Sequence, residues 1–189
     1  QLVGDDQTAL GRAVSMNDSS TRIAISTGRE VSVKEFDSEL ARWVSLGTPI
    51  IQPGIVASVA MNSIGDMVAI ATADSDGIPN AQLHRFDGTD WHLEQGNLTM
   101  GQDVTEDVKD QVLQSQVAMN ANGTRLIHSV AGCGCNGIGF AKVYERNTET
   151  SQWSPLGDRI QGEGSYGSAA AISGDGQTIT IGAPQLATE

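Results

Sequence analysis

The sequence predicts an all-β chain, a β-propeller of four-stranded antiparallel blades. The first observation behind this prediction is a pattern that occurs four times: a short apolar run, a turn rich in Asn, Asp and Gly, and a second apolar run. The copies lie at 13–25, 58–70, 117–127 and 170–181. Two apolar runs joined by such a turn are typical of a tight β-hairpin, and a period of about 50 residues is typical of propeller blades.

The second observation is the spacing of the copies. With the residue that closes the first apolar run as marker, the copies are placed at Met16, Met61, Met119 and Ser173, which are 45, 58 and 54 residues apart. These distances leave room for two further strands per copy, with loops of variable length. Each copy is therefore predicted to be the inner half of one blade.

The third observation concerns the outer half of each blade. The third strand is predicted to end on an aromatic residue, namely Phe36, Phe86 and Tyr144, and a fourth strand follows around Trp43, Trp91 and Trp153. Since the tryptophans recur at one repeat position, we expect each to be a packing anchor of its blade, with a ligand-stacking platform as the alternative.

The repeats define the expected domain organisation, which is a single repeat domain over 1–189. The units are approximately 5–50, 51–98 and 115–162, with a split unit formed by 163–189 and a connector at 1–4. About three and a half blades are expected, as part of a propeller completed by further blades of the same or another chain, because open strand edges favour aggregation. Residues 99–114 form an acidic insertion, in which Val104, Val108 and Val112 have helical spacing.

Composition narrows the function classes. Eleven Lys and Arg against 23 Asp and Glu give a formal charge of −12, which disfavours binding to nucleic acid or to anionic membranes. No apolar run approaches the length of about 20 residues that a membrane-spanning helix needs, so no membrane span is expected. Two cysteines are too few for a disulfide framework, and they leave the compartment open.

The unit as a whole resembles the FG-GAP-like β-propeller repeats of secreted and cell-surface proteins of bacteria and of algae such as diatoms. The resemblance rests on 168–176 with 179–184, and on the W-x-x-L-G strand with its connector at 153–162. It implies an extracellular or cell-surface location, with the lumen of an organelle as the alternative. Members of this family often carry a calcium loop, whose nearest match is formed by Asp74, Asp76 and Asn80; a plain polar turn is the alternative.

Three N-x-Ser/Thr triplets are candidate glycosylation sites in a eukaryotic secretory route. They are centred on Asn17, Asn97 and Asn122. The alternative is chance, since two of the three lie in turns where Asn is favoured by the backbone conformation.

One residue departs from its repeat column. His128 aligns with Ile25, Ile70 and Ile181, so it is expected to be buried and to need a polar partner. Cys133 and Cys135 follow in a Gly-rich loop, and with His128 they would supply three ligands for zinc. A strained disulfide between the two cysteines, or free thiols beside a hydrogen-bonded core histidine, are the alternatives.

Catalysis has little support in the sequence, which contains no G-x-S-x-G, H-E-x-x-H, P-loop or Rossmann pattern. His84 and His92 are expected on solvated faces. The sequence therefore favours a non-catalytic interaction module without a cofactor, used for adhesion or as an extrinsic subunit of a larger assembly, with a protein partner. A calcium-assisted carbohydrate-binding propeller is the alternative, and a propeller hydrolase is less favoured.

Overall fold

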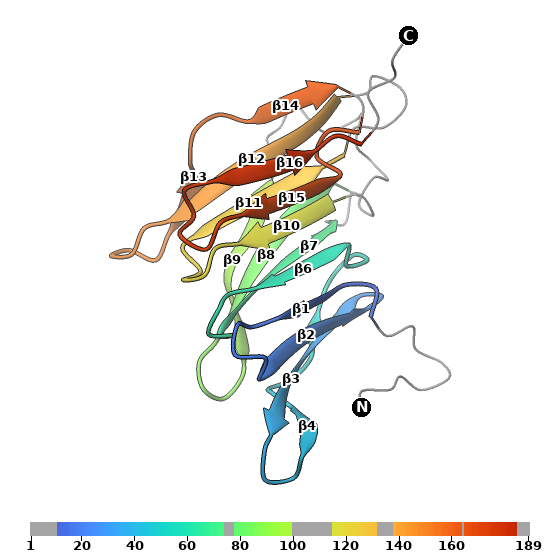
Figure 1. The fold of residues 1–189 in the computed structure, drawn as a ribbon, viewed down its shortest axis with the longest axis vertical. Coiled ribbons are helices and arrows are strands. Elements are labelled where there is room, and N and C mark those ends of the chain that lie inside the picture. Colours follow the sequence, from blue (N-terminus) through green and yellow to red (C-terminus); the bar gives the residue numbers. More distant parts are fainter. Residues whose placement is uncertain (1–10, 74–77, 100–114, 132–137, 164, 185–189) are drawn as a thin grey trace.

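The computed structural model describes residues 11–73, 78–99, 115–131, 138–163 and 165–184. These residues form sixteen β-strands in four antiparallel sheets that follow one another along the long axis of the molecule (Figure 1). The described residues include no helix, and hence none that is long and apolar enough to cross a membrane. The all-β prediction is confirmed, and each sheet is one blade.

Each blade is a meander in which consecutive strands pair. Blade 1 contains β1 (Val14–Met16), β2 (Arg22–Thr27), β3 (Glu30–Asp37), β4 (Arg42–Ser45) and β5 (Ile50–Ile51). Blade 2 contains β6 (Ser58–Met61), β7 (Met67–Ala73), β8 (Pro79–Phe86) and β9 (Trp91–Thr99). Blade 3 contains β10 (Ser115–Met119), β11 (Arg125–Val130), β12 (Ile138–Arg146), β13 (Trp153–Pro155) and β14 (Ile160–Glu163). Blade 4 contains β15 (Ala169–Ile172) and β16 (Ile179–Gly182).

The fourth strand of a blade is continuous in blade 2 and divided in blades 1 and 3. In blade 1, β4 pairs with the end of β3 and β5 pairs with its beginning, and β13 and β14 divide β12 in the same way. Gly47 and Gly157 interrupt the strand with positive φ values of 73° and 76°, which glycine adopts without steric cost. Each divided strand therefore still covers the outer edge of its blade.

The core lies between the blades, because each sheet is apolar on both faces. We call the side that meets the preceding blade the leading face and the opposite side the trailing face. The leading faces carry mostly large side chains: Val14, Met16, Ile23 and Ile25 in blade 1, Val59, Met61, Val68 and Ile70 in blade 2, Val117, Met119, Leu126 and His128 in blade 3, and Ala170, Ile172, Ile179 and Ile181 in blade 4.

The trailing faces carry mostly smaller side chains. They consist of Ala13, Ser15, Ala24 and Ser26 in blade 1, Ser58, Ala60, Ala69 and Ala71 in blade 2, Gln116, Ala118, Ile127 and Ser129 in blade 3, and Ala169, Ala171, Thr180 and Gly182 in blade 4. Three hydrophobic clusters fill the three interfaces between consecutive blades. Large side chains thus pack into the space that small ones leave, which is the condition for a close-packed interior.

The inner hairpin turns share one pattern of side-chain to backbone hydrogen bonds. The side-chain oxygen of a polar residue at the first turn position accepts hydrogen bonds from backbone N–H groups at the far end of the turn. Asn17 accepts from Thr21 and Arg22, and Asn120 accepts from Thr124 and Arg125. Asn62 and Ser173 occupy the same place in the other two blades. The Asn-rich turns of the sequence are therefore built around these side chains.

The turns also connect the blades to one another. The N–H of Asp18 donates to the carbonyl of Ser63, the N–H of Ser63 donates to Ala121, and the N–H of Ala121 donates to Gly174, over 3.1, 2.9 and 3.0 Å. This series of backbone hydrogen bonds, which we call the turn ladder, joins four consecutive blades at one end of the sheets.

Two details of the repeat alignment are corrected by the structure. Ser173 is equivalent to Asn120 rather than to Met119, because the N–H of Ser173 bonds to Thr178 as that of Asn120 bonds to Arg125. The last inner hairpin therefore follows the third after 53 residues. On the third strands, Arg146 pairs with Trp153 as Phe36 pairs with Trp43 and Phe86 with Trp91. Tyr144 thus does not occupy the repeat position of the two phenylalanines.

Candidate functional site

The residue that departs from its repeat column, His128, lies on the leading face of blade 3 with no exposed surface. Its register partner on β10 is Val117, as Val14 is for Ile25 and Val59 for Ile70. Its Nε2 lies 2.7 Å from Oγ of Ser115, which is also fully buried. The predicted burial and the predicted polar partner are both found.

The electrostatics of His128 favour the neutral ring. Burial lowers the pKa of His128 to about 4, although the Leu98 backbone acts in the opposite direction. The Nδ1 atom makes no hydrogen bond of good geometry with any described residue. Nε2 and the hydroxyl of Ser115 form this hydrogen bond in either neutral tautomer, with Nε2 as the acceptor in one and the donor in the other. The pair is buried among strands, so in this arrangement it stabilises the interface between blades 2 and 3.

Of the predicted zinc ligands, only His128 belongs to the described residues. Cys133 and Cys135 lie outside the described residues, and the zinc, disulfide and thiol alternatives therefore stay predictions. Within the described ranges no three His, Cys, Asp or Glu side chains gather as a metal site would require.

Of the three predicted calcium ligands, only Asn80 belongs to the described residues. Asp74 and Asp76 lie outside the described residues, whereas Asn80 is part of β8 and is buried. Both side-chain atoms of Asn80 lack a hydrogen-bond partner among the described residues. Since the other two ligands lie outside the described residues, the calcium site stays a prediction.

The three candidate glycosylation sites differ in accessibility. Asn122 is exposed, and the side chain of Asn97 lies outside what the structure describes. Asn17 is buried, and its Nδ2 lies 2.9 Å from the hydroxyl of Ser19, to which it donates. A glycan on Asn17 would displace the atoms that hold the first turn, so this fold disfavours that prediction.

The repeat tryptophans lie at the contacts between blades. Trp91 and Trp153 are buried, and the indole Nε1 of Trp91 donates to the carbonyl of Leu46 in the preceding blade over 2.8 Å. Trp43 is half-buried and meets Phe36 edge to face at 5.5 Å, and Phe86 lies 5.3 Å from Trp91. Tyr144 belongs to the cluster between blades 2 and 3. These positions are those of packing anchors.

One of the histidines expected on a solvated face is not there. His84 is buried, its Nε2 lies 3.5 Å from Nε2 of Gln52, and burial lowers its pKa to about 4. The segment after β5 that carries Gln52 covers it, a contact over 32 residues of sequence. His92 is exposed as predicted and pairs with Asp87 at 2.9 Å.

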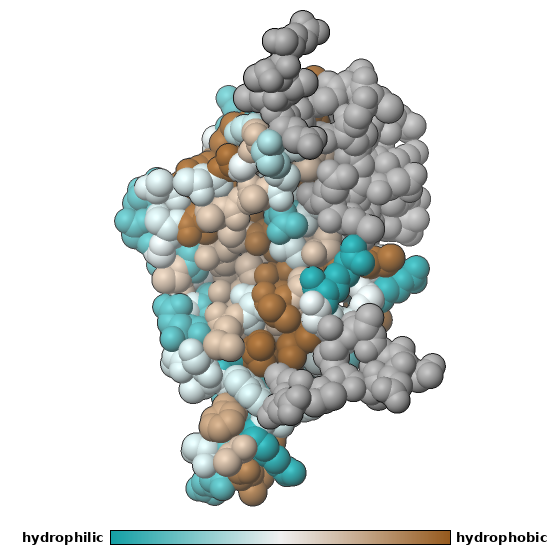
Figure 2. Space-filling view, turned by 45° about the vertical axis from the view of Figure 1, so that its right-hand side comes forward, coloured by the Kyte–Doolittle hydropathy of each residue, from teal (hydrophilic) through white to brown (hydrophobic). Residues whose placement is uncertain are grey.

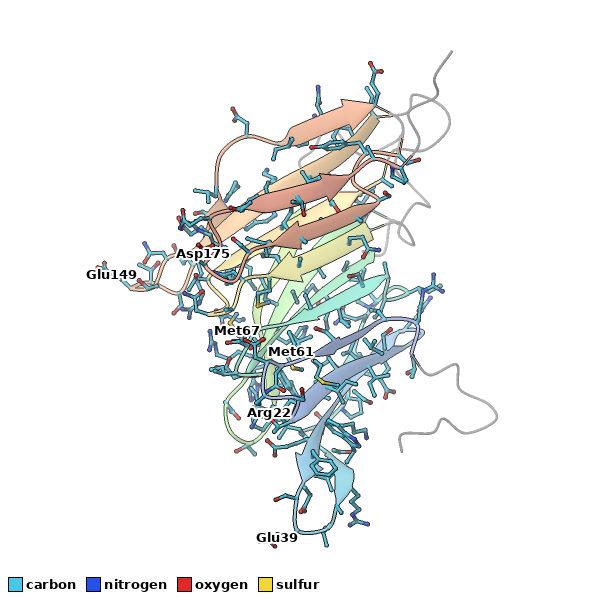
Figure 3. All side chains as sticks on the ribbon, in the orientation of Figure 1. Arg22, Glu39, Met61, Met67, Glu149 and Asp175 are labelled. Atoms are coloured by element: carbon cyan, nitrogen blue, oxygen red, sulfur yellow. The ribbon has the colours of Figure 1, made fainter. Side chains whose placement is uncertain are left out.

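The turn end of the blades is the surface that sequence reasoning did not single out. The seven turns that join β1–β2, β3–β4, β6–β7, β8–β9, β10–β11, β12–β13 and β15–β16 all lie at the same end of the sheets, because consecutive strands are antiparallel. Together they hold seven carboxylates and no Lys, Arg or His: Asp18, Glu39, Asp66, Asp87, Asp90, Glu149 and Asp175. Figure 3 shows Glu149 and Asp175 at this end and Glu39 at the tip of the β3–β4 turn.

Several turn carboxylates are held in the ionised form. The backbone N–H groups of Asp90 and Thr89 lower the pKa of Asp87, and that of Thr48 lowers the pKa of Asp90. The hydroxyl of Ser173 lowers the pKa of Asp175. At neutral pH the turn end therefore stays anionic.

Four arginines near the turn end are engaged mainly by carboxylates of the strands, although Arg85 also pairs with Asp66 and Arg125 contributes to the lowered pKa of Asp175. Arg22 pairs with Glu35 and Arg125 with Glu145, both on the neighbouring strand. Arg85 bonds to Asp66 and Glu94, and Arg146 of the next blade bonds to the same Glu94. These cations are engaged mainly on the strands, whereas Arg42 is exposed at the start of β4 beside the β3–β4 turn, so the negative charge dominates at the other turns.

The turn end also contains a hollow of about 490 Å³ in blade 3. It lies between the β10–β11 and β12–β13 turns, and its lining includes Asn122, Glu145, Arg146, Asn147 and Glu149. A polar hollow that holds two carboxylates and an arginine is suited to a hydrogen-bonding group rather than to an apolar ligand.

Comparisons with known proteins bear on the fold. No protein-family model and no curated protein matches the chain. Among solved structures, it is similar to hydrazine synthase of Kuenenia stuttgartiensis (TM-score 0.57, 12% identity, 89% of this chain and 40% of the other), and to TolB of Acinetobacter baumannii (TM-score 0.51, 12% identity, 92% and 37%). It is also similar to the Swd1 β-propeller domain of Myceliophteria thermophila (TM-score 0.52, 15% identity, 88% and 47%).

The chain spans less than half the length of these solved structures, and at such low identity the likeness concerns the fold alone. It agrees with the sheet order, in which four antiparallel sheets stack face to face through apolar side chains. The chain is a β-propeller of four-stranded antiparallel blades, of which the described residues form three blades and two strands of a fourth.

Proposed function

We propose that this propeller is a non-catalytic protein-interaction module that binds a basic segment of a protein partner at its turn end. The observation that supports the proposal is the set of seven turns with seven carboxylates and no cationic side chain. Charge of one sign over such a surface attracts partners of the opposite sign and raises their rate of association.

The arrangement of the turns supports the same proposal. The turn ladder and the buried Asn side chains hold the inner turns in fixed relative positions. A surface whose carboxylates are already positioned loses little conformational entropy when a partner binds. An extrinsic subunit of a larger assembly and a module for adhesion at the cell surface would both use the blades in this way.

The proposal is tested by titrating the chain with a lysine- and arginine-rich peptide and measuring the dissociation constant at several salt concentrations. Asp18, Glu39 and Glu149 are exposed, and their carboxylates make no hydrogen bond or ion pair with described residues. The triple variant Asp18→Asn, Glu39→Gln and Glu149→Gln should weaken binding at least about tenfold at low salt, and less at high salt.

A matched control separates the turn end from the overall negative charge. Glu163 is exposed at the end of β14, where the strand pairs with the start of β12 at the opposite end of the blade. Glu163→Gln should leave the dissociation constant within about twofold, since one distant charge contributes little beyond a Debye length. Equal weakening by the triple variant and by charge neutralisation at the opposite end would contradict a site at the turns.

A further inference from the structure

The leading face of blade 1 is the one leading face that no described blade covers. Its exposed part is on β1, where Val14 is 58% exposed and Met16 is 47% exposed, whereas their equivalents in blade 2, Val59 and Met61, are both 7% exposed. On β2 of the same face, Ile25 is 5% exposed. Exposed hydrophobic surface lies at the level of β1 and β2 in Figure 2. Contiguous exposed apolar side chains of this kind mark an interaction surface.

The molecule itself shows what covers such a face. The leading faces of blades 2, 3 and 4 each pack against the trailing face of the blade before them. The small side chains of that trailing face make room for the larger ones, and its serines add polar contacts: Oγ of Ser15 accepts from the N–H of Met61 and Oγ of Ser58 from that of Val117. The apolar packing is common to all three interfaces, and the serine contacts occur at the first two.

A trailing face of the same kind is exposed at the other end of the array. In blade 4 it consists of Ala169, Ala171, Thr180 and Gly182, and the first three are exposed. Their opposite neighbours Ala170, Ile172, Ile179 and Ile181 are packed against blade 3. Within the described residues, one leading face and one trailing face are therefore left without a covering blade.

The turn ladder leaves complementary backbone groups at the same two places. Each ladder bond runs from an N–H to the carbonyl of the equivalent residue in the following blade. Among the described residues, the N–H of Gly174 in blade 4 has no acceptor and the carbonyl of Asp18 in blade 1 has no donor. A blade 4 placed before a blade 1 would extend the ladder by one more bond.

From these two observations we propose that the leading face of blade 1 docks a second copy of this chain, through the trailing face of that copy's blade 4. The contact is heterologous, because two different faces meet, so it closes into a ring if the rotation permits and otherwise continues as a filament. The proposal does not depend on a partner at the turn end.

The test uses two variants of the full chain, each of which alters one face. Met16→Lys places a charge on the leading face of blade 1, and Ala171→Glu places one on the trailing face of blade 4. Both positions are exposed in the single chain, so both variants should keep the thermal unfolding midpoint of the wild type. By analytical ultracentrifugation the wild type should associate, and each variant alone should dissociate at concentrations at least about 100-fold higher than the wild type.

Mixing the two variants distinguishes a heterologous from an isologous contact. The Met16→Lys chain keeps its trailing face and the Ala171→Glu chain keeps its leading face, so these two unaltered faces can meet. If the ring then closes, its second contact brings the introduced ammonium group opposite the introduced carboxylate. Association should therefore return in the mixture. Ile64→Lys is the control, because Ile64 is similarly exposed but lies in the β6–β7 turn, away from both faces; it should associate as the wild type does.

Three results would overturn the proposal. A wild-type chain that remains monomeric at millimolar concentration would assign the free faces to another partner. Association that neither variant weakens would place the contact elsewhere. Association that Met16→Lys abolishes but the mixture does not restore would show that two copies meet through the same face.

Discussion

Nε2 of His128 and Oγ of Ser115 lie 2.7 Å apart in a part of the interface between blades 2 and 3 where neither residue has exposed surface. The other blades place isoleucine at the position of His128. The third blade has therefore replaced an apolar contact by a buried hydrogen bond, which is stable only while both partners are present.

The first prediction concerns this pair. Ser115→Ala leaves a buried ring nitrogen without its partner and should lower the free energy of unfolding by about 1–3 kcal/mol. The double variant Ser115→Ala with His128→Ile restores the repeat residue and removes both polar groups, so it should lose less than Ser115→Ala alone. Urea unfolding of the two single variants and the double variant measures the coupling; additive losses would contradict it.

The second prediction concerns pH. Burial lowers the pKa of His128 to about 4, below the ordinary value of 6.5, so between these values the unfolded chain binds a proton that the folded chain does not. The stabilisation is present above pH 6.5 and is lost as the pH falls towards 4. The wild type should lose a few kcal/mol more over this range than His128→Ile, as measured by urea unfolding at about pH 7 and about pH 4.5. Equal pH slopes in the two proteins would contradict a buried neutral ring.

The third prediction concerns the carboxylate shared by two blades. Glu94 bonds to Arg85 of its own blade and to Arg146 of the next, and its side chain is 11% exposed. Glu94→Gln leaves Arg146 without its charge partner and Arg85 with Asp66 alone, and it should cost about 3 kcal/mol in unfolding free energy. Glu35→Gln is the control, because Glu35 pairs with Arg22 at 39% exposure and should cost less than about 1 kcal/mol. Similar losses for the two variants would argue against a structural role for the shared carboxylate.

The fourth prediction concerns a turn glycine. Gly123 has a φ of 69°, and a Cβ added there would lie 2.7 Å from Sδ of Met67 in the preceding blade. Gly157 has a φ of 76°, but nothing lies within 4 Å of its Cβ position. Gly157→Ala should cost about 1–2 kcal/mol through backbone strain alone, and Gly123→Ala should cost more. Thermal unfolding midpoints would show the difference, and equal midpoints would mean that Met67 moves aside freely.

The repeat pattern was sufficient to predict the sheets and the burial of His128, because both follow from local alternation of apolar and polar residues. It misplaced Ser173, which directly follows an apolar run and was therefore aligned with the residues that close such runs. In the structure its hydroxyl accepts the backbone hydrogen bond that an Asn side chain accepts in the other turns. It also misplaced Tyr144, because an arginine at 146 stands where the other blades have phenylalanine.

Other features depend on contacts that a repeat pattern does not contain. His84 is buried by the segment that carries Gln52, which is 32 residues away in sequence. Because the residues of its own strand do not reveal this contact, His84 was predicted on a solvated face. The anionic turn end becomes visible only when the seven turns are placed at one end of the sheets, since each turn by itself holds no more than two carboxylates.

The turn ladder has a consequence for how such a chain can change over evolutionary time. Its donors and acceptors are backbone groups of Asp18, Ser63, Ala121 and Gly174, four residues with no side-chain chemistry in common. The register between neighbouring blades is therefore insensitive to which side chain a mutation places at these positions, with the exception of proline, which has no N–H to donate. Repeats connected in this way can diverge in sequence until their common pattern is faint, while the spacing between blades is preserved.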